Sequence, residues 1–100
     1  MLFRSANSKT SWLAQNWDWM PAQKRNLIVL SIPSQSHAPS VPAIKMVTEA
    51  GIIGKIGLNS SGVGVCLNAI KIKGMDPTKL PCHLGLRMVL ESPSRAEAER

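Results

Sequence analysis

The stretch GIIGKIGLNSSGVGVCLNAI, from Gly51 to Ile70, predicts a β-hairpin. Two short apolar runs flank the segment NSSG, residues 59–62, whose composition is typical of a tight turn. Glycine weakens a strand, so its frequency here indicates that another backbone or a layer of side chains approaches the hairpin closely. The glycines in question are Gly51, Gly54, Gly57 and Gly64.

Three segments before the hairpin also have strand-like patterns. Residues 10–19, TSWLAQNWDW, read as a strand with Trp12, Ala14 and Asn16 on one face and Leu13, Gln15 and Trp17 on the other. Residues 25–32, RNLIVLSI, are apolar and β-branched, which predicts a strand buried on both sides or nearly so. Residues 43–50, AIKMVTEA, alternate, with Ile44, Met46 and Thr48 opposing Lys45, Val47 and Glu49.

Proline and serine separate these strands from one another. Residues 33–42, PSQSHAPSVP, contain three prolines and three serines without apolar periodicity, so they predict an exposed loop that includes His37. A second loop, KIKGMDPTKLP, follows the hairpin.

The segment CHLGLRMVLES predicts an amphipathic helix from Cys82 to Glu91. His83, Arg87 and Glu91 form one polar stripe, and Leu84, Leu86, Met88 and Leu90 cover the rest. Ser94 and Glu97 then match a capping box that opens a further helix. Because the chain stops at Arg100, after barely one turn, we expect residues 92–100 to be a truncated helix start.

Composition is typical of a single small globular domain, residues 1–100. The chain is 44% apolar and 18% charged, unlike a disordered protein. No apolar run is long enough to cross a bilayer, and MLFRSANSK is too short in its apolar part for a secretory signal. We therefore expect an intracellular α+β domain with no membrane partner.

The charge balance is basic, with twelve Lys and Arg against six Asp and Glu. Such a balance can indicate a nucleic-acid partner. The cations are scattered singly or in pairs, however, and no cluster is interleaved with the aromatic side chains that a stacking surface requires. We expect a solvated basic surface and no nucleic-acid partner.

The cysteines and histidines do not suggest a metal or cofactor site. Two cysteines make neither a disulfide framework nor a zinc quartet. Cys66 is expected to be a small core residue inside a strand, and Cys82 a buried thiol beside His83 at the helix start. The pair Cys82-His83 supplies only half of a metal site.

The segment NWDW places Asp18 between two of only three tryptophans. A carboxylate surrounded by apolar surface is costly unless it is hydrogen-bonded. Asp18 is therefore either a turn residue capped by local bonds or a working group in a pocket. Residue patterns alone name no reaction.

Three blocks together resemble the acyl-coenzyme A:isopenicillin N acyltransferase family, also called the C45 peptidase family. They are LAQNWDWM, VTEAGIIGKIGLNSSGVGVCLNAI and LPCHLGLRMVLES, and the resemblance covers about residues 11–91. More distantly, NWDW and GLNSSGVGVCLN look like strands of bile salt hydrolases and penicillin V acylases. The family belongs to the N-terminal nucleophile hydrolases, so the resemblance implies a partial αββα sandwich. The strands would belong to its antiparallel sheets and residues 82–91 to a covering helix.

The resemblance also implies a chemistry. A precursor cleaves itself before a cysteine, whose thiol attacks a thioester or amide and whose new α-amine is the base. An amine or water then takes the acyl group. Asp18 would orient that amine, Trp17 and Trp19 would form or support the acyl pocket, and Asn68 would match an oxyanion-hole asparagine. The alternative for Asn68 is a strand-end amide. No cofactor is implied, and acyl-coenzyme A is a possible substrate.

The nucleophile departs from the family pattern. The family's cysteine would fall at or just before Met1, whose thioether cannot act as a nucleophile, and MLFRSANSKT offers no cysteine. Gln15 stands where bile salt hydrolases often carry arginine. We expect an inactive fragment that lacks the remainder of its fold. The alternative is a small non-catalytic interaction module that pairs through exposed sheet edges. A cytoplasmic or a peroxisomal location fits either hypothesis.

Overall fold

The computed structural model describes residues 2–4, 10–35, 41–70 and 73–100. Its main sheet has four antiparallel strands in the order β3-β4-β5-β6, and β1 pairs with β2 in a separate two-stranded sheet. The strands are β1 (Leu2–Arg4), β2 (Ser11–Leu13), β3 (Leu27–Ile32), β4 (Ile44–Glu49), β5 (Ile56–Asn59) and β6 (Gly64–Val65). The helices are the 3₁₀ helix η1 (Pro21–Asn26), α1 (Cys82–Glu91) and α2 (Arg95–Ala98).

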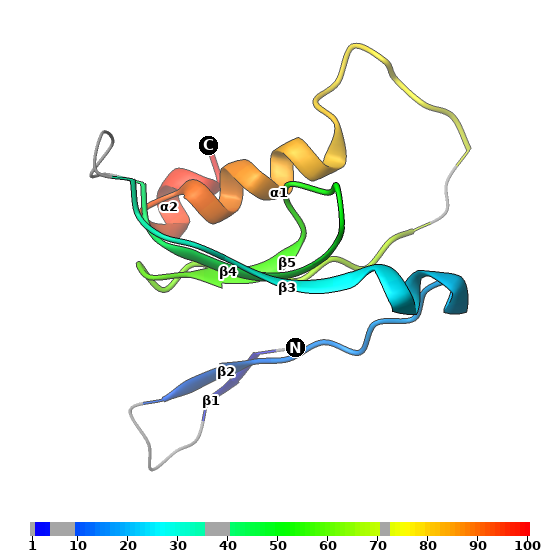
Figure 1. Ribbon diagram of the computed structural model, residues 1–100. Helices are drawn as coiled ribbons and strands as arrows, with labels where there is room; N and C mark the ends of the chain where they lie inside the picture. The colour runs from blue at the N-terminus through cyan, green and yellow to red at the C-terminus, as the bar shows by residue number, and fades with distance from the viewer. Residues whose placement is uncertain (1, 5–9, 36–40, 71–72) are drawn as a thin grey trace.

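The elements form three layers (Figure 1). Helices α1 and α2 cover one face of the four-stranded sheet, and the β1–β2 pair lies beyond the opposite face. This confirms the predicted α+β class, with an antiparallel sheet and a covering helix. The succession of helix, sheet and sheet corresponds to part of an αββα sandwich.

Strand β4 supplies most of the core between the sheet and α1. Ile44 and Met46 are 1% and 2% exposed, and they pack with Leu90 of α1, which is fully buried. Thr48 shares this face and is also fully buried, while Lys45 and Val47 are exposed. The predicted alternation along residues 43–50 is therefore confirmed, because a strand presents successive side chains to opposite faces. Glu49, on the outer face, is nevertheless buried.

The predicted hairpin is formed by β5 and β6, with the turn at residues 59–62. Its central side chain is Asn59, which is 2% exposed. Asn59 Oδ1 accepts from the amides of Ser61 and Val63 at 3.0 and 2.9 Å, and Nδ2 donates to the carbonyls of Leu90 and Ser92 at 3.0 and 2.7 Å. One amide therefore holds the turn and joins it to the end of α1. Gly62 completes the turn with a φ of +83°, a conformation that glycine adopts without strain.

Gly54 explains why the region is rich in glycine. A Cβ at this buried position would come within 2.6 Å of the Arg87 backbone nitrogen. Helix α1 therefore approaches the segment between β4 and β5 at a distance that a larger residue would prevent. This confirms the predicted close approach of another backbone.

Helix α1 has the predicted bounds, and its predicted polar stripe is present, since Arg87 Nε donates to Glu91 Oε1 at 2.7 Å, but the stripe packs against another segment of the chain. His83 and Arg87 face the segment before β5: His83 Nδ1 lies 2.9 Å from the Gly54 carbonyl, and Arg87 Nη1 donates to the Ile53 carbonyl at 3.2 Å. Leu84 and Met88 are exposed instead. The reason is that residues 53–54 are outside any strand, so their carbonyls need side-chain donors.

The predicted strand over residues 10–19 is also wrong in extent. Regular pairing ends at Leu13, and residues 14–20 belong to no helix or strand. Residues 25–26 end η1, so β3 begins only at Leu27. As an edge strand β3 is not buried on both sides, and Val29 is 75% exposed. Strand β6 has only two residues, so half-buried Cys66 follows the strand instead of lying inside it.

The remaining loop and cap predictions have mixed outcomes. Residues 33–35 are exposed as predicted, but Pro42 at the other end of the loop is buried, and His37 lies outside the described residues. Cys82 is exposed, so the predicted buried thiol is wrong: it is the first residue of α1 and directly follows an exposed loop. Ser94 caps α2 as predicted and accepts from the Glu97 amide at 3.2 Å.

Candidate active site

A cavity of about 890 Å³ lies where the NWDW segment, the chain after β6 and the start of α1 meet. Asp18 and Asn68, the two residues proposed from sequence for catalysis, both line it, and so do Trp17 and Trp19. Lys55 and His83 are also part of its wall. The fold thus brings two distant parts of the chain to one opening.

Gln15 joins these two parts directly. Its Oε1 accepts from the Leu67 amide at 3.0 Å, and its Nε2 donates to the Leu67 carbonyl and, at 2.8 Å, to Asn68 Oδ1. The side chain therefore pairs with Leu67 much as a neighbouring strand would. The sequence marks Gln15 only as a departure from arginine, and no local pattern predicts the bridge, because Leu67 is 52 residues away.

The Gln15 contacts also fix the orientation of Asn68. Because the Leu67 amide can only donate, the Gln15 atom facing it is the oxygen, and its nitrogen must face Asn68. Asn68 Oδ1 is therefore the acceptor. Its Nδ2 group, on an exposed side chain, remains as a hydrogen-bond donor at the cavity.

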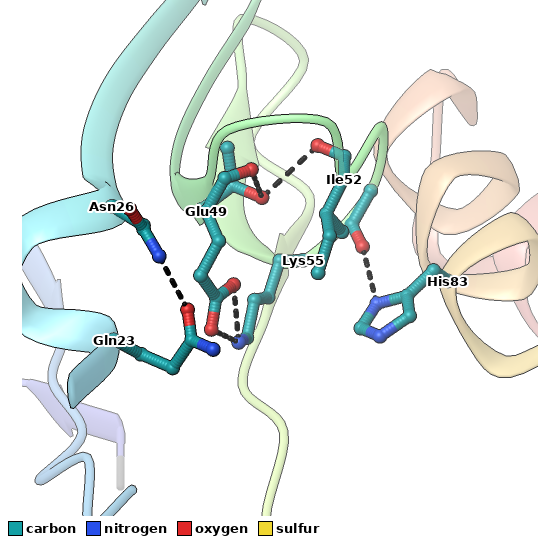
Figure 2. A network of polar contacts seen from close by, with 8 residues as sticks. Gln23, Asn26, Glu49, Ile52, Lys55 and His83 are labelled. Atoms are coloured by element: carbon teal, nitrogen blue, oxygen red, sulfur yellow. Dashed lines mark hydrogen bonds and ion pairs between the residues drawn. The ribbon is translucent and has the colours of Figure 1, made fainter. Parts of the chain in front are cut away.

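A buried ion pair joins Lys55 to Glu49 (Figure 2). Lys55 Nζ is 2.5 and 2.6 Å from the two oxygens of Glu49, and each side chain is 7% exposed. The same ammonium lies 4.4 Å from the ring centroid of Trp17 and 5.7 Å from that of Trp19. These are cation–π distances. The sequence pattern does not indicate the pair, since its partners are on either side of a loop.

Asp18 is exposed, in contrast to the buried ion pair. Among the described residues, no side-chain or backbone donor binds its carboxylate. Asp18 is therefore not the locally capped turn residue that was one of the two hypotheses for it. A carboxylate at the wall of a cavity can accept hydrogen bonds from an ammonium group that enters it.

His83 and Cys82 complete the wall on the α1 side. The Gly54 carbonyl can only accept, so His83 Nδ1 carries the hydrogen of that bond (Figure 2).

Within the described ranges no group of three or more His, Cys, Asp and Glu side chains could hold a metal ion. Over the same ranges, no helix has the length and apolar character needed to cross a membrane.

Comparison with known proteins gives a match over most of the chain. The family model described as acyl-coenzyme A:6-aminopenicillanic acid acyl-transferase matches residues 5–100. The chain belongs to this family. The resemblance noted from the three sequence blocks is thereby confirmed.

One relative in the acyl-transferase family is the acyl-coenzyme A:6-aminopenicillanic-acid-acyltransferase 40 kDa form of Emericella nidulans. It is 57% identical over 84 residues, which cover 84% of this chain and 22% of the relative. The chain therefore spans less than a quarter of that protein's length.

Proposed function

We propose that this chain forms part of the site of a cysteine-dependent acyltransferase, which moves an acyl group from a thioester or amide to an amine or water. The observation that carries the proposal is that Asp18 and Asn68 line one cavity. Membership of the acyl-transferase family supports the reaction class. The name of the Emericella nidulans relative supports acyl-coenzyme A as donor and 6-aminopenicillanic acid as acceptor.

In this proposal Asp18 accepts a hydrogen bond from the α-amine of an N-terminal cysteine and orients it as the base. Its exposed carboxylate has no competing donor among the described residues. The amine takes the thiol proton, the thiolate attacks the donor carbonyl, and the leaving thiol or amine takes that proton. An acceptor amine or water then releases the acyl group and restores the thiol.

Asn68 is proposed to donate to the oxyanion through Nδ2, which the Gln15 bond to Oδ1 leaves available. Donors of this kind commonly contribute about 10²–10³-fold to the rate. Trp17 and Trp19 are proposed to line the acyl side of the cavity.

The nucleophile is proposed to be a cysteine placed directly before Met1, where the family pattern expects it. Neither Cys66 nor Cys82 can combine a thiol with an α-amine, because both are internal. A chain of residues 1–100 alone should therefore not turn over phenylacetyl-coenzyme A above a heat-treated control. The cysteine-extended chain, in which a protease exposes one cysteine added before Met1 and the part of the Emericella nidulans relative that follows the match continues the chain after Arg100, should release coenzyme A and acylate 6-aminopenicillanic acid.

Asp18→Asn in this cysteine-extended chain should lower the rate of acyl transfer by about 10²-fold or more, because the amine loses its charged partner. The rate is measured by chromatography of coenzyme A and acylated product. Asp76→Asn is the matched control, since Asp76 is exposed and its carboxylate hydrogen-bonds only Thr78 among the described residues. Equal rates for the two variants, or full activity without the added cysteine, would contradict the proposal.

A second candidate is the non-catalytic interaction module, favoured by the edge strand β3. It ends the four-stranded sheet, and Val29 on it is 75% exposed. Such an edge is available for pairing with another strand. This candidate predicts that sedimentation of the chain shows self-association and that Val29→Lys abolishes it. A monomer at all concentrations would remove self-pairing as its function.

A further inference from the structure

Lys55 is a buried cation whose place in the fold is unusual. It lies in the segment between β4 and β5 and is 6% exposed, yet it also reaches the wall of the cavity that contains Asp18. Its ammonium has one ionic partner, Glu49, and two aromatic neighbours, Trp17 and Trp19. These two tryptophans are the residues on either side of Asp18.

We propose that Lys55 is a positioning residue for Asp18, which acts by holding both flanking indole rings so that the carboxylate stays at the cavity wall. The inference rests on the proposed function for its catalytic consequence, but the positioning itself is a separate physical claim. Lys55 contacts neither Asp18 nor, in this proposal, the reacting atoms.

The backbone around Asp18 needs such a support. Residues 15–19 belong to no helix or strand, so among the described residues no ladder of backbone hydrogen bonds of a regular element fixes them. The described side-chain anchors of this stretch are the Gln15 bridge to Leu67 and Asn68 and the two ring contacts with Lys55. Gln15 is three residues before Asp18, whereas the rings are directly adjacent to it.

Glu49 makes a cation at this place possible. Both carboxylate oxygens bind Lys55 Nζ, which leaves the rest of the ammonium for the rings (Figure 2). A charge buried without a partner is strongly unfavourable. Because Glu49 ends β4, the rigid four-stranded sheet fixes the ion pair, and the ion pair fixes the irregular segment around Asp18.

The competing interpretation is that the ion pair only stabilises the loop between β4 and β5. A double-mutant cycle separates the two, because residues that act through one another are non-additive. The cycle uses the cysteine-extended chain with Lys55→Met, Asp18→Asn and the combination of both. If Lys55 acts through Asp18, Lys55→Met has little further effect on the rate of acyl transfer in a chain that already carries Asp18→Asn.

Lys55→Met should lower kcat for phenylacetyl-coenzyme A on the order of 10²-fold, the loss expected when a catalytic group is displaced by about 1 Å. KM should change by less than about threefold, since the cavity wall is kept. Lys55→Arg should recover most of the loss, because a guanidinium also pairs with a carboxylate and stacks on aromatic rings. Lys79→Met is the control for the lost charge, since Lys79 is exposed in the loop before α1 and is not among the residues that line the cavity.

The double variant E49L/K55M covers the possibility that Lys55→Met fails to fold. It removes both charges and should fold, yet it should lose acyl transfer as Lys55→Met does. Full activity of E49L/K55M would overturn the positioning role. The role would also be overturned if Lys55→Met lowered the rate of acyl transfer by the same factor in the Asp18→Asn chain as in the chain that keeps Asp18.

A spectroscopic readout keeps this inference independent of the reaction. In NMR spectra of the chain without the added cysteine, E49L/K55M should shift and broaden the Trp17 and Trp19 indole signals and the Asp18 carboxyl signal. The Trp12 signal is the internal control, because this exposed ring lies on β2. If no variant transfers acyl groups, the proposed function fails while these shifts still support positioning. Unchanged signals of Trp17, Trp19 and Asp18 would refute the positioning role of Lys55.

Discussion

Replacement of Asn59 with alanine should lower the free energy of unfolding by about 3–5 kcal/mol. Asn59 is 2% exposed, and its amide makes four hydrogen bonds to backbone groups. Each buried group left without a partner costs about 1–3 kcal/mol, and the shorter side chain also leaves a cavity. Relaxation and entering water reduce the sum of these terms. Urea unfolding followed by circular dichroism measures the loss.

The expected decrease for Asn59→Ala is a large part of the total free energy of unfolding, because a chain of 100 residues is stabilised by about 5–15 kcal/mol. Asn26→Ala is the matched control: Asn26 is exposed, and its side chain donates only to Gln23 among the described residues. It should cost less than about 0.5 kcal/mol. Asn59→Asp keeps the acceptor for Ser61 and Val63 but loses the donor to Leu90 and Ser92, so it should also destabilise. If Asn59→Ala unfolds like Asn26→Ala, the turn and the helix are not joined in this way.

Local patterns in the sequence were sufficient for several elements. The alternation of residues 44–48, the turn NSSG and the bounds of α1 depend on neighbours within a few positions, and all are confirmed. The close approach at Gly54 also follows from a local composition, since only a residue without Cβ fits against α1.

The faces of α1 and the end of β2 depend on partners far along the chain. A helical wheel places His83 and Arg87 on one polar stripe, but it does not show that the stripe faces the carbonyls of Gly54 and Ile53, which lie about thirty residues earlier in the chain. Similarly, the segment after Leu13 has an alternating pattern, yet it leaves the sheet because Gln15 binds the backbone of Leu67 by its side chain.

The candidate site shows the same division. The composition of NWDW and the resemblance of the three blocks were enough to select Asp18 and Asn68, and both line one cavity. The supports of these residues could not be selected in that way. Gln15, Glu49 and Lys55 are ordinary surface residues by type, and only the contacts show that each holds part of the cavity wall.

Glu49→Gln should destabilise the chain by about 3–5 kcal/mol, the usual effect of removing one partner from a buried ion pair. The substitution keeps the size of the side chain but leaves the Lys55 ammonium, 7% exposed at the side chain, without its counter-ion. The rings of Trp17 and Trp19 compensate only in part, since a cation–π contact contributes about 2 kcal/mol when desolvated. Tryptophan fluorescence and circular dichroism during urea unfolding should report the same decrease in the free energy of unfolding.

The exposed pair Arg95–Glu99 is the matched control for Glu49→Gln. Its side chains are 87% and 60% exposed, and exposed pairs contribute about 0–1 kcal/mol, so Glu99→Gln should have little effect. The double variant E49L/K55M should recover most of the stability, because an apolar pair of similar volume commonly replaces a buried ion pair without loss. If Glu49→Gln costs no more than Glu99→Gln, the Glu49–Lys55 pair is solvated in the protein and cannot anchor the segment that carries Asp18.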